Sequence, residues 1–145
     1  MDASFANPFV GSWAYRSFRN LPTYRFDACQ SCDDLRPIIF GEADLLVVDA
    51  VPGAFRGRLI FQPGVEMALT GASSFGNPFA VRFQGRGISQ GIEDFVYDYV
   101  GYLVPVWPNG VGQRPAIVGS IVRTGPHSGG AEPGEVASWI AVKQD

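Results

Sequence analysis

The chain has 145 residues, a mass of 15.7 kDa, a net charge of −3 at pH 7 and a pI near 5.0. This length fits one domain over residues 1–145, and the negative charge excludes a nucleic-acid partner, which needs clustered positive charge. The 18 Gly and 11 Pro separate short apolar stretches, which is typical of many strands joined by turns. The sequence has no apolar run long enough for a membrane-spanning helix, so we expect no membrane partner.

The first half of the chain predicts four strands and one long loop. The first strand covers residues 10–18, where Trp13, Tyr15 and Ser17 share one face. Residues 19–37 are polar and contain two Cys and two Pro, which predicts a long loop of the kind that is usually functional or mobile. Three strands follow, separated by Pro-Gly turns, over residues 39–49, 54–61 and 65–72.

The second half predicts four more strands, over residues 78–87, 92–104, 115–124 and 136–143. The first of them has the clearest alternation in the chain, with Phe79, Val81 and Phe83 on one face. The last three carry apolar residues on both faces, whereas a wall that faces water should alternate. We therefore expect a second subunit to cover the outer face, and we predict a homodimer.

Eight strands joined mostly by short turns predict pairing between neighbours in the chain. Closing such a meander into a barrel removes its exposed edges. The predicted fold class is therefore all-β, a single eight-stranded antiparallel up-and-down β-barrel, with a two-sheet sandwich as the alternative. We expect Phe79, Val81 and Phe83 to point to the same interior as Tyr15, and Trp13 to plug one closed end.

Gly11-Ser12-Trp13 resembles the Gly-x-Trp signature of the calycin barrels, the group that holds lipocalins, fatty-acid-binding proteins and avidins. Residues 99–101, 116–125 and 137–143 are similar in layout to the late strands of the streptavidin family. The resemblance implies the barrel fold. The biotin-site residues of avidins are not matched, because only Tyr15 and Ser17 stand in for the polar set and residues 35–49 lack the Tyr-x-Ser element.

Cys29 and Cys32 form a lone C-x-x-C, without the preceding strand and following helix of a thioredoxin-like centre. With His127, the sole histidine, and Asp33 or Asp34, the pair could bind zinc. Isolated pairs in loops are more often free thiols or an occasional disulfide, so we predict no metal and no cofactor. His127 lies in a Gly-rich stretch unsuited to a rigid nucleophile–base pair, and we identify no catalytic residue.

Asp98 is the most informative acidic residue. It lies in mid-strand on a face shared with Val96 and Val100, and a charge in apolar company needs a partner. Arg82 or Arg123 could supply that partner. A structural ion pair is the favoured interpretation, and an anchor for a polar group of a ligand is the functional one.

Aromatic residues gather around residues 97–102 and Trp107, beside a loop rich in Pro and Gly. Aromatic rings can line a concave site and orient a ligand through their polar tips, although ordinary core packing also explains them. We predict that Trp107 and residues 21–35 frame the mouth of a pocket. The predicted ligand-binding residues are Tyr15, Ser17, Arg82, Tyr97, Tyr99, Trp107 and Arg123.

These features give three hypotheses for the function. The first is binding of a small, partly apolar molecule in the barrel interior. The second is a small barrel cyclase or isomerase in which a Tyr or a carboxylate moves one proton. The third is a structural barrel whose interior is filled, so the sequence does not decide whether the protein is an enzyme. The candidate carboxylates Glu42, Asp44 and Glu66 are expected to face solvent.

Residues 1–5 lack the features of a secretory signal, so we expect a cytoplasmic protein.

Overall fold

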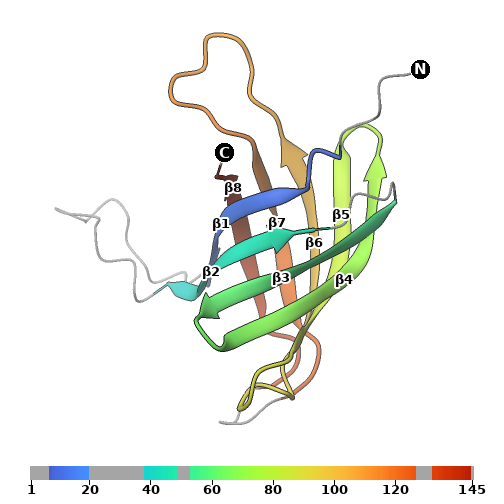
Figure 1. The fold of residues 1–145 in the computed structure, drawn as a ribbon, viewed down its shortest axis with the longest axis vertical. Coiled ribbons are helices and arrows are strands. Elements are labelled where there is room, and N and C mark those ends of the chain that lie inside the picture. Colours follow the sequence, from blue (N-terminus) through green and yellow to red (C-terminus); the bar gives the residue numbers. More distant parts are fainter. Residues whose placement is uncertain (1–6, 20–37, 49–52, 127–131, 145) are drawn as a thin grey trace, which may run out of the picture.

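The structure is a computed structural model that describes residues 7–19, 38–48, 53–126 and 132–144 (Figure 1). All eight predicted strands are present: β1 (Gly11–Phe18), β2 (Ile39–Val47), β3 (Ala54–Gln62), β4 (Val65–Phe75), β5 (Phe79–Gly87), β6 (Val96–Val104), β7 (Ala116–Arg123) and β8 (Val136–Lys143). The described residues form no helix, and hence none with the length and hydrophobicity to cross a membrane.

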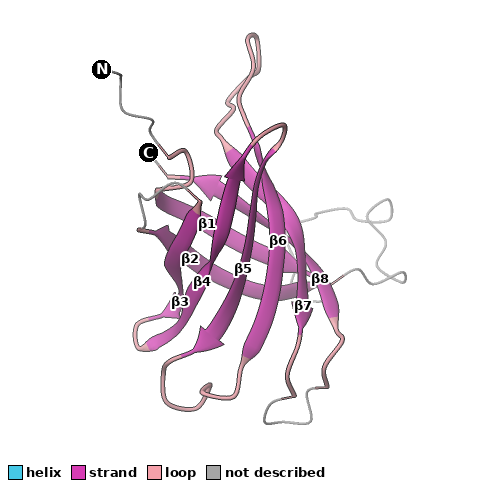
Figure 2. Cartoon of the chain, turned by 90° about the vertical axis from the view of Figure 1, so that its right-hand side faces the viewer, coloured by secondary structure: helices cyan, strands magenta, loops and turns pink. Residues whose placement is uncertain are grey.

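The strands pair in chain order and close into one antiparallel barrel, as Figure 2 shows from the side. The closing pair joins β1 to β8, with Trp13 opposite Lys143 and Phe18 opposite Ser138. The predicted up-and-down barrel is therefore confirmed and the sandwich alternative is wrong. The layout is compatible with that of a calycin barrel.

The predicted strand bounds differ most at β6, which begins at Val96 rather than at residue 92. The preceding residues form turns instead: the Phe95 amide donates to the Ile92 carbonyl oxygen at 3.0 Å, and the Ile92 amide donates to the Ser89 carbonyl oxygen at 3.2 Å. Hydrogen bonds within these turns thus replace the strand pairing that the apolar alternation had predicted for residues 92–95.

Period-two burial fills the interior with one face of every strand. Val81 and Phe83 are buried in the same core as Trp13 and Tyr15, and Phe79 is partly buried against it, as expected. The Phe83 ring stacks between those of Phe55 and Tyr99, with centroid separations of 4.5 and 4.6 Å. This aromatic stack joins the inner faces of β3, β5 and β6.

The plugged end of the barrel is the end where β1 begins and β6 ends, and its interior holds Phe9 and Trp13. Both side chains are fully buried. The Trp13 indole Nε1 donates to the Phe9 carbonyl oxygen at 3.0 Å, so its polar atom is satisfied. The Phe9 ring contacts Phe55 and Phe75, with centroids 6.4 and 6.3 Å away. Trp13 closes this end, as the sequence predicted.

The outer face of β6 and β7 carries half-buried valines, such as Val100, Val118 and Val122, next to Tyr102, which is 48% exposed. This is the apolar outer face on which the homodimer was predicted. The structure contains one chain and does not test that assembly, which stays a prediction.

Candidate functional site

A cavity of about 240 Å³ lies inside the barrel at the end opposite Trp13, where β1 ends and β6 begins. We refer to it as the cavity end. Its polar lining consists of Tyr15, Ser17, Arg19, Tyr97, Tyr99 and Arg123. Its apolar lining includes the rings of Phe40, Phe61 and Phe95. No Asp or Glu is among the described residues that line it.

Strand alternation and register bring these polar side chains together. Tyr15 and Ser17 are successive inward positions of β1, and Tyr97 and Tyr99 are the corresponding pair on β6. On β7, Arg123 lies directly opposite Tyr97. The interior therefore becomes polar where β1 and β7 end and β6 begins.

A β-bulge adds Phe40 to the lining. Ser17 pairs with Gly41 while the next residue of β1, Phe18, pairs with Ile39, so the partner strand has one extra residue at Phe40. Bulges change the direction of a side chain locally. The Phe40 ring consequently contacts the Tyr97 ring edge to face, at a centroid separation of 6.0 Å. The two successive residues Phe40 and Gly41 thus both line the cavity, which regular alternation would not allow.

The buried phenols of Tyr15 and Tyr99 stay neutral well above neutral pH. Burial raises the pKa of Tyr15 to about 12, and the smaller effects of the nearby Ser17 and Tyr99 hydroxyls act in the opposite direction. Burial also raises the pKa of Tyr99 well above its usual value, with a further contribution from Tyr15. Both groups therefore face the interior as neutral hydroxyls that can donate or accept a hydrogen bond.

The Ser17 hydroxyl lies near the Tyr15 phenol, but it is the one described buried side-chain polar atom that makes no hydrogen bond of good geometry. The residue is fully buried, and its Oγ lies 3.0 Å from the position that a Cβ at Gly41 would occupy. An unsatisfied buried hydroxyl costs about 1 to 3 kcal/mol. Such a group at the wall of a cavity is suited to bind something that enters the cavity.

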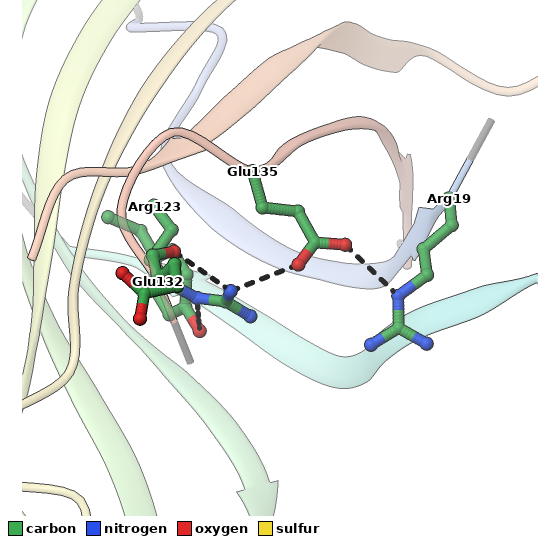
Figure 3. Close-up of polar contacts among 5 residues, drawn as sticks. Arg19, Arg123, Glu132 and Glu135 are labelled. Carbon is green, nitrogen blue, oxygen red and sulfur yellow. Dashed lines mark hydrogen bonds and ion pairs between the residues drawn. The ribbon is translucent and has the colours of Figure 1, made fainter. Parts of the chain in front are cut away.

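Arg123 is held at the rim of the cavity by three neighbours (Figure 3). Its Nη1 lies 3.0 Å from Glu135 Oε1 and donates to the Glu132 backbone carbonyl oxygen at 3.1 Å. Its Nε donates to the Tyr97 hydroxyl at 3.5 Å, which is a long contact. Burial by itself lowers the pKa of Arg123, but Tyr97 and Glu135 together outweigh it and raise that pKa, so the guanidinium stays charged.

A second guanidinium shares the same carboxylate. Arg19 Nε lies 3.4 Å from Glu135 Oε2, and Figure 3 shows Glu135 between the two arginines. The guanidinium carbons of Arg19 and Arg123 lie 5.3 and 5.6 Å from the centre of the Phe40 ring, within cation–π range. The described lining of the cavity therefore holds two positive side chains, and Glu135 lies between them.

Five of the predicted ligand-binding residues come together in this cavity, namely Tyr15, Ser17, Tyr97, Tyr99 and Arg123. The other two lie elsewhere. Arg82 is exposed on the outer face because it alternates with the buried Val81 and Phe83, and it lines a shallow outer groove of about 760 Å³. Trp107 is 62% exposed in the β6–β7 connection, at the end opposite the cavity, so it does not frame the mouth.

The predicted environment of Asp98 is wrong. Its side chain is exposed on the outer face and accepts a hydrogen bond from Gln84 Nε2 at 3.0 Å. Neither predicted arginine forms an ion pair with it among the described contacts, since Arg123 points inward to Glu135. Asp98 therefore lies on the outer wall and forms no buried ion pair among the described contacts.

Sequence reasoning missed Arg19, Phe40 and Glu135. Arg19 was assigned to the long loop, and Glu135 precedes β8 without a local motif. Phe40 was missed because regular alternation hides a bulge. The one usable signal was that Arg19 directly follows the predicted first strand.

The other predicted chemistry lies beyond what the structure describes. Cys29, Cys32, His127 and residues 21–35, proposed as part of the mouth, are outside the described residues. Within the described ranges, no three His, Cys, Asp or Glu side chains cluster as metal ligands would. In comparisons with known proteins, no family model matches this chain, and no curated protein or solved structure is significantly similar to it.

Proposed function

We propose that this barrel binds a small, partly apolar molecule in the cavity bordered by β1, β2, β6 and β7. The observation that carries the proposal is a cavity of about 240 Å³ whose wall contains the buried, unpartnered Ser17 hydroxyl. A dry apolar cavity of about 150 Å³ is already sufficient for benzene. The volume therefore suits one ring or a short branched chain with a polar group attached.

The polar groups favour binding over proton transfer. A catalytic acid or base works best when its pKa lies near the working pH, whereas burial moves the pKa of Tyr15 away from neutrality, to about 12. The candidate carboxylates lie elsewhere: Glu42 pairs with Arg16 at 3.1 Å, Glu66 pairs with Arg58 at 3.1 Å, and Asp44 is exposed. A cyclase or isomerase is thus the second candidate, and it would need a proton carrier that these residues do not supply.

A purely structural barrel is the third candidate, and the plugged end fits it best. There Phe9 and Trp13 fill the interior and leave their polar atoms satisfied. The cavity end differs in both respects. A barrel with no ligand would gain stability by filling this space, because cavities and unsatisfied hydroxyls both cost free energy.

We also propose that the arrangement of strands resembles that of the calycin barrels, including the avidin family. Two observations support this: the eight-stranded closed meander, and the Gly-x-Trp triplet at Gly11 to Trp13 that opens β1. The proposal concerns the arrangement of strands and not the ligand, since the biotin-site residues are not matched.

Binding is tested by ligand-observed NMR with neutral probes of suitable size, such as benzyl alcohol and cyclohexanol. We expect saturable binding that is lost in Ile121→Phe, because Ile121 is buried and lines the cavity, and a larger side chain there fills it. The matched control is Thr70→Phe on the exposed outer face of β4, which should bind like the original protein. Binding that Ile121→Phe leaves intact in a folded protein would contradict the proposal, and so would the absence of binding to these neutral probes and to charged probes of the same size.

A further inference from the structure

The described residues that line the cavity include two positively charged side chains and no negatively charged one. Arg19 and Arg123 line the cavity and share the single carboxylate of Glu135. This arrangement leaves one positive charge without a carboxylate partner among the described residues. A partly buried cation attracts an anion more strongly than an exposed one, because water screens it less.

Arg123 retains hydrogen-bonding capacity. A guanidinium is a planar fork with five N–H donors, and two of its edges can bind a carboxylate at two points. Glu135 and the Glu132 carbonyl oxygen use Nη1, and Nε has only the long contact of 3.5 Å to Tyr97. Nη2 meets no acceptor among the described residues. The edge formed by Nε and Nη2 is therefore the one suited to a carboxylate of a ligand.

The rest of the cavity restricts the body of such an anion. Ser17 adds one buried hydroxyl that has no partner, and Tyr15 and Tyr99 present neutral phenols. The remaining lining is apolar and includes Phe61, Ile92, Phe95 and Ile121. An apolar body fits this lining, whereas a sugar or another highly polar molecule would leave many of its own groups without hydrogen bonds.

From these observations we infer that the ligand is a small monocarboxylate with a compact apolar body, and that its carboxylate binds Arg123. This inference rests on the proposed function and specifies its ligand class. Glu135 binds Nη1 of the same guanidinium, and its negative charge opposes the binding of a second carboxylate there. Arg19, which also pairs with Glu135, offsets part of that charge.

Three probes of nearly equal shape isolate the charge: benzoate, benzamide and benzamidine, which are an anion, a neutral molecule and a cation. Dissociation constants are measured by calorimetry at pH 7 and low salt. We expect benzoate to bind at least tenfold more tightly than benzamide, and benzamidine to show no measurable binding. Equal affinity for benzoate and benzamide would overturn the inference and leave the proposed function standing.

Two variants should change the affinity for benzoate in opposite directions. Arg123→Met should reduce it at least tenfold and bring it to the level of benzamide, because the charged fork is gone. Glu135→Gln should increase it several-fold, because the competing carboxylate is gone while the shape is kept. The matched control is Arg82→Met, which removes an exposed arginine from the outer face and should leave all three affinities unchanged.

The outcomes separate the two proposals. If neutral probes such as benzyl alcohol bind but benzoate does not, the carboxylate inference is wrong and the proposed function stands. If no probe of any charge binds, the proposed function fails and the inference fails with it. Should Arg123→Met not fold, Glu135→Gln decides, since unchanged or weaker benzoate binding in that variant overturns the role of the Arg123–Glu135 pair.

Discussion

The two ends of the barrel interior are built from the same strands and differ in their chemistry. At the plugged end, Phe9 and Trp13 fill the space, and the indole donates to a backbone carbonyl oxygen. At the cavity end, the next two inward positions of the same strand β1 are Tyr15 and Ser17, beside about 240 Å³ of space. All four of these side chains are buried to the same degree, so burial does not distinguish packing from a site. The unsatisfied polar atom does.

The largest expected difference concerns the tryptophan at the plugged end. Trp13→Ala should lower the free energy of unfolding by about 3 to 5 kcal/mol, because it leaves a large cavity in a well-packed region. Tyr15→Phe removes only a hydroxyl at the cavity end and should cost about 1 kcal/mol or less. Urea unfolding measures both changes. Similar losses in the two variants would mean that the ends do not differ in packing.

The buried phenols predict a loss of stability at high pH. Well below pH 10 the Tyr15 phenol is neutral in the folded and unfolded states, so it contributes no pH dependence there. Between pH 10 and about 12 the unfolded state ionises while folded Tyr15 keeps its proton, and stability should fall by roughly 2 to 3 kcal/mol. Tyr15→Phe should reduce this alkaline loss.

Chemical denaturation at a series of pH values from 8 to 12 measures the alkaline effect. The control is Tyr102→Phe, which removes a tyrosine that is 48% exposed on the outer face and should leave the alkaline loss in place. An identical pH dependence in Tyr15→Phe and the original protein would show that Tyr15 is not held neutral by burial.

Two buried serines allow a direct test of hydrogen-bond satisfaction at the two ends. Ser17 has no partner, whereas the Ser73 hydroxyl near the plugged end donates to the Ala54 carbonyl oxygen at 3.1 Å. Ser17→Ala should therefore leave stability unchanged or raise it by about 1 kcal/mol, and Ser73→Ala should lower it by about 1 kcal/mol. Thermal unfolding compares them, and equal losses would show that Ser17 does have a partner in solution.

The smallest effect on ligand binding in the cavity is expected from a substitution on the outer face of the barrel. If the chain forms the predicted homodimer through β6–β8, Val118→Arg should shift it toward the monomer, because a charge in an apolar interface is costly. Sedimentation velocity measures the change. Probe binding in the cavity should stay the same, since Val118 lies on the outer face. A monomeric original protein would make the homodimer prediction wrong.

Period-two patterning made the barrel and much of the cavity lining predictable. Tyr15 and Ser17, like Tyr97 and Tyr99, alternate so regularly that their shared face is readable from the chain. Pairing between distant segments was not readable: Glu135 reaches Arg19 and Arg123 only because β8 closes on β1 and β7. The bulge at Phe40 was hidden for a related reason, because it depends on how two strands match rather than on either strand alone.

Asp98 shows where patterning misleads. A carboxylate between apolar neighbours looks buried when the outer wall is assumed to be covered. In the folded chain it faces outward and shares a hydrogen bond with Gln84 of the adjacent strand. Arg82 is outward for the same reason, since strand parity decides its direction before its charge has any influence.

The pairing of the first and last strands makes the barrel a ring without an obligatory starting point. The Gln144 amide donates to the Ser12 carbonyl oxygen at 2.8 Å, so a short peptide linker could connect the two ends of this ring at its plugged face. A circularly permuted chain that starts at Gly64, in the tight β3–β4 turn, would retain every strand neighbour. Such permutants would place fusion partners or surface tethers beside the cavity end, far from the original ends.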